Sequence, residues 1–346
     1  MGIAIKNRSQ LYLSITVNRT PPKNIQPSDE IFFKHEYEKT FPPVYLYELN
    51  NVNVSPEGIV FRNFEVFEPC LIDPTRKKNY NWKYIFSNKL QRKKIILPKN
   101  EKYILAFDEW SNGYFHWMCD VMPRLIALDN DLNNLKDYYL LLPENYNQPF
   151  IYDTLNIFDF KGICKIPSDS FCCVRNLVMP THIAPTGNYN IEVMHELKNK
   201  LIDFYYKNDI SLGDKIYISR KKAAYRYILN EEEVIEELNQ WGFKVVYFED
   251  YSFQEQISIC KNAKYLIGII GANLINMMFM PIGGNVLLFN KANNTEDNCY
   301  FSLANVFRHS FLYQFCEYKD TKPGAYWNLI VDIKLLRKNL DVMFNN

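Results

Sequence analysis

The sequence predicts an α/β protein, chiefly because strand-like and helix-like segments alternate along the chain. Between residues 208 and 320, short runs of apolar and β-branched residues alternate with segments whose apolar residues recur at helical spacing. The connections between these segments are short, which is typical of a doubly wound parallel sheet. The first half alternates less regularly. Since 346 residues are enough for two domains, we expect two α/β halves.

The composition is that of a globular protein. Hydrophobic residues make up 47% of the chain and the net charge is +1, with Lys and Arg scattered, which argues against nucleic acid as a partner. Eight cysteines without a CxxC pair predict reduced thiols and no zinc site. No stretch of about 20 apolar residues occurs, and the first residues lack a signal-peptide pattern, so a cytoplasmic protein is expected. A peripheral contact with the inner face of the membrane stays open.

The first half is expected to contain mostly strands. Residues 1–43 are polar and contain several prolines, with one early strand. A helix is expected over 114–128, which Pro123 should kink or restart. The charge runs 76–78 and 92–94 are expected at the solvated surface. A second helix is expected over 148–158, and strands over 11–17, 44–49, 52–61, 64–70, 95–98, 103–107, 138–142, 162–166 and 171–179.

The second half has a cleaner pattern, which begins with an amphipathic helix over 190–207. We place the domain boundary just before this helix, which gives domains 1–189 and 190–325. Asn230 and Ser252 are expected to cap helices, with Glu255 completing a capping box. Strands are expected over 215–219, 244–248, 265–270, 286–289 and 310–316, and helices over 230–241, 252–261, 274–280, 296–307 and 329–340.

The stretch 264–290 is the first candidate for a binding site. Gly271, Ala272 and Asn273 directly follow a strand and precede a short helix. Small residues at such a turn allow a ligand to approach the backbone closely, and the N–H groups at a helix start suit a phosphate. An ordinary connection between a strand and a helix would have the same sequence, so this stretch alone leaves both interpretations open.

A cationic cluster is the second candidate. Arg220, Lys221, Lys222 and Arg226 follow the strand 215–219. Ligands in open α/β sheets bind beyond the carboxyl ends of the strands, so this cluster would suit a diphosphate. The alternative is a solvated loop.

The third candidate is a possible acid–base group. His116, Asp120 and Arg124 recur every four residues, so on a helix they share one face. A carboxylate beside a His and an Arg could act as a general base. The alternative is a hydrogen-bonded structural cluster beside a buried Trp117. The nearest approach to a DxD-like pair is Asp108-Glu109, which is weak, so no metal site is expected.

Three blocks of the sequence together resemble glycosyltransferase family 61. The first, 112–125, is similar to the family's N-Y-F-H-W-x-x-D-x-L-P-R-L. The second comprises 217–226, 230–231, 242–243 and 252–256. The third, 271–281, is similar to the family's H-G-A-G-L-T-N-x-x-F-M-P-P-G. Four residues depart from the family pattern: Ile270 replaces the His, Asn273 the following Gly, Ile275 the Thr, and Leu288 an acidic residue that is often present.

The resemblance implies a GT-B architecture, in which two Rossmann-like domains face each other across a cleft and a C-terminal helix, 326–346, crosses back to the first domain. It implies an inverting glycosyltransferase that requires neither a metal nor a cofactor. The donor would be a nucleotide sugar, expected to be a UDP-sugar. The acceptor would be a glycan, with a lipid-linked form open, in capsule, lipopolysaccharide or related surface-glycan synthesis.

The resemblance also implies roles for individual residues. Asp120 would be the catalytic base and His116 would orient it, with Arg124 and Trp117 on the acceptor side or in support. Donor binding would fall to Arg220, Arg226, Gly271, Ala272, Asn273 and Asn276. The alternative is a weakened or inactive family member that binds glycans or nucleotide sugars. A dinucleotide-dependent enzyme is disfavoured, because no GxGxxG follows a first strand.

Overall fold

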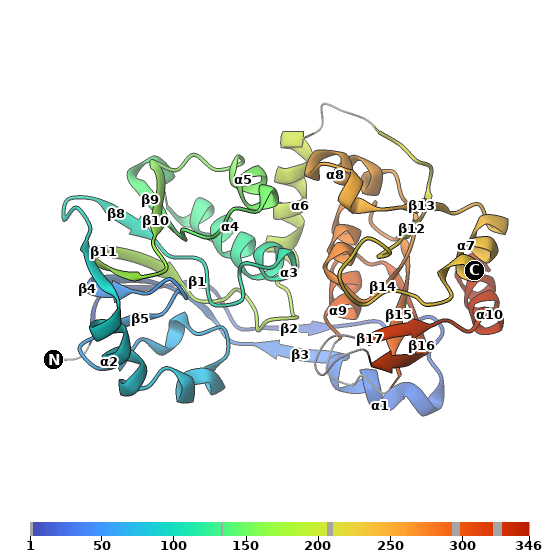
Figure 1. Ribbon diagram of the computed structural model, residues 1–346, viewed down its shortest axis with the longest axis horizontal. Coiled ribbons are helices and arrows are strands. Elements are labelled where there is room, and N and C mark those ends of the chain that lie inside the picture. The colour runs from blue at the N-terminus through green and yellow to red at the C-terminus, as the bar shows by residue number, and fades with distance from the viewer. Residues whose placement is uncertain (1–2, 133, 206–209, 293–297, 321–326, 346) are drawn as a thin grey trace. The chain divides into compact units, whose positions relative to one another are not determined.

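The computed structural model describes residues 3–132, 134–205, 210–292, 298–320 and 327–345 (Figure 1). The chain divides into two compact units. Unit 1 comprises Met1–Ile15 and Thr40–Leu197, and unit 2 comprises Thr16–Lys39 and Lys198–Asn346. Each unit contains a sheet with helices packed around it, which confirms the α/β class.

The described part of unit 1 is built on a mixed sheet of nine strands in which β10, β9, β8 and β11 are parallel neighbours. The antiparallel strands β4, β5 and β6 continue the sheet beyond β11. The strands are β1 (Ala4–Tyr12), β4 (Val44–Val54), β5 (Val60–Arg62), β6 (Glu65–Val66), β7 (Lys93–Ile96), β8 (Lys102–Ile104), β9 (Tyr138–Pro143), β10 (Gly162–Ile166) and β11 (Ser170–Pro180).

Helices cover both faces of this sheet. Figure 1 shows α4 and α5 on one face and α2 on the other. Helix α2 was not predicted, and its Ile85 packs against Phe61 of β5 and Phe171 of β11. The helices are α2 (Trp82–Gln91), α3 (Tyr114–His116), α4 (Met122–Asp131), α5 (Pro149–Leu155) and α6 (Ile191–Tyr205), which continues into unit 2.

The described part of unit 2 contains a six-stranded sheet in the order β13-β12-β14-β15-β16-β17. The first five strands are parallel and β17 is antiparallel to β16. The strands are β12 (Lys215–Ile218), β13 (Lys244–Val246), β14 (Tyr265–Ile269), β15 (Asn285–Lys291), β16 (Ser310–Asp320) and β17 (Trp327–Ile330), and the main helices are α7 (Glu231–Gln240), α8 (Phe253–Lys261), α9 (Cys299–Val306) and α10 (Ile333–Phe344).

Helix α8 begins as predicted. The Ser252 side chain accepts from the N–H of Glu255, whose carboxylate accepts from the N–H of Ser252. Asn230 stands at the N-cap of α7, but its side chain bonds to the backbone of Val331 rather than to the helix. The reason is that β17 runs beside this loop and offers backbone groups to it.

Three expectations about the domains need adjustment. The division between units at Leu197 falls inside α6 rather than before it. Residues 16–39 belong to unit 2, where α1 (Glu30–Phe33) places the Phe33 ring 4.8 Å from that of Tyr313. Helix α10 is also part of unit 2, and its Phe344 ring stacks 5.3 Å from Trp241 at the end of α7. The expected boundary at 325/326 and the helix ends at 207 and 296 lie outside the described residues.

The last predicted helix is partly wrong. Its first residues form β17, which pairs Leu329 with Tyr318 of β16. Helix α10 begins only at Ile333, after Asp332 caps it by accepting from the N–H groups of Lys334 and Leu335. None of the described helices combines the length and the apolar character that a bilayer crossing requires.

Candidate active site

Strand order marks one region in each unit where a ligand site is expected. In unit 1, β8, β9 and β10 run outward in chain order, and β11 then returns to the other side of β8. In unit 2, β13 lies on one side of β12 and β14 on the other. Ligands of open α/β sheets bind beyond the carboxyl ends of strands at such reversals. We call the β8/β11 region switch point 1 and the β12/β14 region switch point 2.

Switch point 1 contains the predicted acid–base pair. The Nδ1 atom of His116 lies 2.7 Å from Oδ2 of Asp120, and the Thr186 hydroxyl donates to the same oxygen over 3.1 Å. The Asp120 side chain is 2% exposed, whereas that of His116 is 27% exposed. The carboxylate is therefore fixed from two sides, while the imidazole reaches the surface.

A π-helical turn, Trp117–Val121, carries Asp120. Helix α4 continues directly from it, and Pro123 lies in the first turn of α4, immediately after the π turn. Pro123 was predicted to kink or restart the helix; the structure instead has an unbroken helical run over 114–131 with a π turn just before the proline. Single π turns inside helices occur frequently at functional sites.

Arg124 and Trp117 support this region from inside. The Arg124 guanidinium is fully buried and donates to the carbonyl of Ala106 over 2.8 Å and to that of Pro180 over 2.7 Å. It therefore ties together the chain ends that leave β8 and β11. The Trp117 indole N–H donates to the Thr154 hydroxyl over 2.7 Å. Both side chains are positioned as structural supports.

A second carboxylate–histidine pair, which the sequence did not reveal, lies in the same region. Oδ2 of Asp108 is 3.0 Å from Nε2 of His182, and the Asp108 side chain is 2% exposed. Burial opposes ionisation of Asp108, but the hydrogen bond and charge of His182 and the charge of Arg124 outweigh it and lower the pKa of Asp108 to about 2. Asp108 follows β8 and His182 follows β11, so their proximity depends on a sheet order that the sequence does not give.

Switch point 2 brings together Arg220 and Gly271. Arg220 follows β12 and Gly271 follows β14, and a Cβ atom at position 271 would overlap the Arg220 guanidinium. The Gly271 backbone is extended, with φ 169°, so what glycine offers here is room for the Arg220 guanidinium rather than conformational freedom.

Arg226 lies beside Arg220. The Arg220 Nε donates to the carbonyl of Arg226 over 3.2 Å, and Nη2 donates to that of Tyr225 over 3.3 Å. Burial and the nearby charge of Arg226 lower the pKa of Arg220. The Arg226 Nε is buried without a hydrogen-bond partner among the described residues. Two repelling cations with spare donors would be stabilised by an anion.

The other predicted donor residues differ in position. Ala272 and Asn273 are partly exposed at the start of a 3₁₀ helix, Ala272–Phe279, which replaces the helix expected over 274–280. Asn276 is fully buried, and its amide donates to Oε1 of Gln256 on α8 over 2.9 Å. Asn276 therefore holds this helix against α8.

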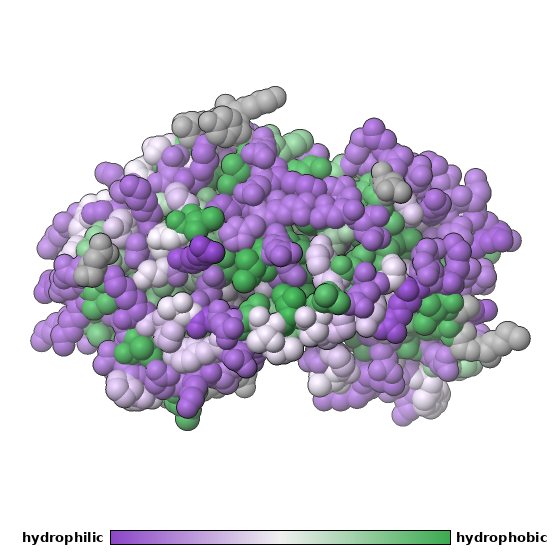
Figure 2. All heavy atoms as spheres, turned by 180° about the vertical axis from the view of Figure 1, so that it is seen from behind, coloured by the Kyte–Doolittle hydropathy of each residue, from purple (hydrophilic) through white to green (hydrophobic). Residues whose placement is uncertain are grey.

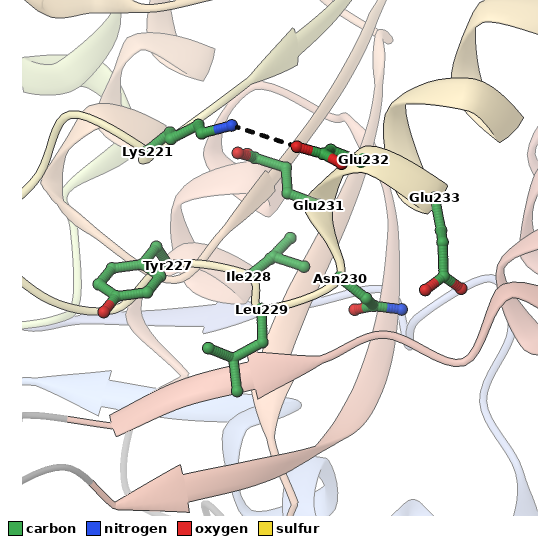
Figure 3. A pocket seen from close by; sticks show the side chains of 8 residues that line it. All are labelled: Lys221, Tyr227, Ile228, Leu229, Asn230, Glu231, Glu232 and Glu233. Carbon is green, nitrogen blue, oxygen red and sulfur yellow. Dashed lines mark ion pairs between the residues drawn. The ribbon is translucent and has the colours of Figure 1, made fainter.

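The loop after β12 also borders a pocket of about 470 Å³ (Figure 3). Figure 3 shows Lys221 and Glu232 pointing toward each other, and their charged atoms are 3.8 Å apart. Glu231 is buried and accepts from the hydroxyls of Tyr217 and Ser219, each over 2.7 Å. The rest of the lining comes from Tyr227, Ile228, Leu229, Asn230 and Glu233.

The described residues contain no group of three or more His, Cys, Asp or Glu side chains placed to hold a metal ion. None of the eight cysteines, all of which lie in the described ranges, forms a disulfide bond.

Comparison with known proteins places the sequence in a family. The model of glycosyltransferase family 61 matches residues 114–287, half of the chain, and this range includes His116, Asp120, Arg220 and Gly271. The chain belongs to glycosyltransferase family 61.

The curated relatives are enzymes named EGF domain-specific O-linked N-acetylglucosamine transferase. The Drosophila melanogaster enzyme is 33% identical over 236 residues, which are 61% of this chain and 44% of that protein. The Bos taurus enzyme is 30% identical over 239 residues, with the same shares. The Pan troglodytes enzyme is 23% identical over 237 residues, again with the same shares. The chain thus matches these relatives over less than half of their length.

Two residues that depart from the family 61 pattern are buried in unit 2, Ile270 directly after β14 and Leu288 within β15. Ile270 is buried, and its N–H donates to the carbonyl of Phe289 over 3.0 Å. Leu288 is buried within β15 and pairs with Gly268. Neither position supplies a polar side chain to switch point 2, so the cationic character of this region comes from the loop after β12.

Proposed function

We propose that this protein is an inverting, metal-independent glycosyltransferase that uses a nucleotide sugar, with a UDP-sugar as the expected donor. The observation that carries the proposal is the pair Arg220 and Arg226 beside Gly271 at switch point 2. The Arg220 guanidinium bonds to the backbone carbonyls of Arg226 and Tyr225, and the Arg226 Nε has no partner among the described residues, so the pair has donor capacity for an anion. A diphosphate bound there would receive charge-assisted hydrogen bonds as negative charge grows on its leaving oxygen.

Asp120 is proposed as the general base. In the ionised form it would take the proton from an acceptor hydroxyl while the hydroxyl oxygen attacks the anomeric carbon. The bond from that carbon to the diphosphate breaks, and the leaving oxygen keeps the electron pair. His116 and Thr186 hold the Asp120 carboxylate in one orientation. For Asp120 to act on a donor held by Arg220 and Arg226, both units must contact the same substrate, as in a GT-B fold. That arrangement is part of the proposal.

Family membership suggests which substrates to try first. The relatives are named as N-acetylglucosamine transferases that act on EGF domains, so UDP-N-acetylglucosamine is the first donor to test. For the acceptor, we retain a surface glycan of the capsule or lipopolysaccharide type at the cytoplasmic face of a membrane. An EGF-like domain is the comparison acceptor.

A second candidate function is favoured by Ile270. A His in this position, at the carboxyl end of β14, could stabilise a leaving diphosphate, and the buried Ile270 cannot do so. The protein would then bind nucleotide sugars or glycans without transferring them. Both candidate functions predict that the donor binds, but only the enzyme would transfer the sugar.

The test is a thermal-shift screen with UDP-, GDP-, CMP- and dTDP-sugars in the presence of EDTA, followed by a transfer assay with the donor that shifts the melt. A ligand at about 100 times its Kd should stabilise the fold by about 2.7 kcal/mol. A shift with EDTA, followed by transfer, supports the enzyme. A shift without transfer or hydrolysis supports the binding module. No shift with any donor contradicts both.

A further inference from the structure

One segment of unit 1 is strongly basic and exposes large apolar side chains. Residues 76–94 contain eight Lys or Arg residues and no Asp or Glu. Helix α2 lies within this segment. Its side chains Trp82, Phe86 and Leu90 are 58%, 47% and 69% exposed. They recur every four residues, so they form one stripe along the helix. Ile85 of the same helix is buried and packs into the unit.

The apolar stripe continues onto neighbouring elements. Phe64, in the turn between β5 and β6, is 57% exposed, and the Lys89 ammonium lies 4.9 Å from its ring centre. In β7, Lys94 pairs with Phe171 and Ile96 pairs with Cys173 of β11. Phe171 and Cys173 belong to the cluster around Ile85, so Lys94 and Ile96 lie on the face of the sheet that carries α2.

A small cavity on this side of the sheet is cationic. It has a volume of about 220 Å³, and its lining includes Lys94, Lys99 and Arg175 but no carboxylate. Among the described residues, these three side chains form no ion pair. We call the exposed residues Phe64, Trp82, Phe86, Leu90 and Ile96, together with Lys83, Lys89, Lys94, Lys99 and Arg175, the basic apolar face.

Other basic residues of the segment are already neutralised. Arg76, Lys77, Arg92 and Lys93 form ion pairs with Glu109, Glu68, Glu57 and Asp169. Of the remaining basic residues of the segment, Lys83, Lys89 and Lys94 belong to the basic apolar face, and Lys78 lies outside it. The side of the molecule drawn in Figure 2 shows hydrophobic side chains as patches among hydrophilic ones.

We propose that the basic apolar face docks on a bilayer that contains anionic lipids. An amphipathic helix with Trp, Phe and Leu on one face and Lys at its margins lies in the interfacial plane of a membrane. Each Lys or Arg near an anionic surface adds to the attraction. The cavity between Lys94, Lys99 and Arg175 would receive a lipid phosphate. This inference rests on unit 1 alone and does not depend on the proposed transfer reaction.

The test is sedimentation of the whole chain with vesicles of phosphatidylcholine, with and without phosphatidylglycerol. Two variants remove the two parts of the face: the triple variant Trp82→Ser, Phe86→Ser and Leu90→Ser, and the triple variant Lys83→Gln, Lys89→Gln and Lys94→Gln. Matched controls remove exposed side chains elsewhere: the triple variant Leu13→Ser, Ile31→Ser and Ile282→Ser, and the triple variant Lys34→Gln, Lys244→Gln and Lys264→Gln. Melting curves check that each variant is folded.

The wild type should bind vesicles with phosphatidylglycerol, and binding should weaken as salt screens the charges. Each variant of the face should lower the partition coefficient at least about tenfold, and each control should leave it within about twofold. Lipids brominated in their chains should quench wild-type fluorescence, and Trp82→Phe should lose most of this quenching while retaining binding. Absence of vesicle binding at low salt, or equal losses in the controls, would overturn the proposal. Self-association that only the apolar triple variant abolishes, without vesicle binding, would instead make this face a contact between two copies.

Discussion

At switch point 1 the chain supplies Asp108 and Asp120, each within hydrogen-bonding distance of a histidine, whereas at switch point 2 it supplies Arg220 and Arg226. Both regions lie where the order of the parallel strands reverses within a mixed sheet. The topology therefore explains where a site can form in each unit. We propose that the side chains near the strand ends decide whether such a site transfers protons or binds anions.

The two regions also use buried arginine differently. At switch point 1 the Arg124 guanidinium is fully buried and is bonded to the carbonyls of Ala106 and Pro180, so it acts within the fold. At switch point 2 Arg220 is half-buried, and it faces a second arginine rather than a carboxylate. Arg220 could therefore bind an anionic ligand, whereas the hydrogen bonds of Arg124 are used within the fold.

The largest expected effect concerns the base at switch point 1. Asp120→Asn should lower the rate of sugar transfer by about 100-fold or more, because general-base catalysis is typically worth that much. Donor affinity should stay within about twofold, since the donor is assigned to the other region. Steady-state kinetics and calorimetric titration with UDP measure the two quantities. Near-normal turnover would assign the base to another residue, with Asp108 the first to examine.

Arg220→Gln should weaken UDP binding by about 10- to 100-fold, because a charge-assisted hydrogen bond to a phosphate is lost. Lys222→Gln is the matched control. Lys222 follows the same strand but is exposed and is already paired with Asp250 over 2.6 Å. Calorimetry in EDTA compares the two. Equal affinities for both variants would remove Arg220 from the donor site.

Asp108 should make the stability of the protein depend on acid pH. The pKa of Asp108 is about 2 in the folded protein, against an ordinary value of 3.8. Its contribution to the free energy of unfolding is therefore present above about pH 4 and is lost as the pH falls toward 2. Between about pH 5 and pH 2, the wild type should lose about 2 kcal/mol of unfolding free energy relative to Asp108→Asn. Urea unfolding measures this difference. Asp159 forms an exposed ion pair with Lys136, so the variant Asp159→Asn should differ little from the wild type in this pH dependence.

The smallest expected effect comes from Gly271→Ala. The added Cβ would overlap the Arg220 guanidinium, and the flexible Arg220 side chain would move aside. UDP affinity should fall by less than about tenfold, with little change in melting temperature. Gly113→Ala is the control, because a Cβ there would have ordinary contact with the carbonyl oxygen of Trp110 at 3.8 Å. A large loss of stability with unchanged affinity would show that Gly271 serves only the packing.

Much of unit 2 could be predicted because its strands and helices keep regular periods and short connections. Arg220 and Gly271 were predicted for the same reason, since each directly follows a clear strand. The pair Asp108 and His182 was missed, because 74 residues separate them and only the order of strands brings them together. Helix α2 was missed because its apolar stripe, formed by Trp82, Phe86 and Leu90, is exposed. Such a stripe normally marks the buried face of a helix.

The central claim is that the diphosphate binds at switch point 2 and the proton is taken at switch point 1. Hydrogen–deuterium exchange of the whole chain with UDP and EDTA tests the first half directly. We predict slower exchange over residues 219–226 and 271–274, and unchanged exchange over 108–124 and 182–186. Protection confined to the latter ranges, or no protection in either region at saturating UDP, would contradict the account.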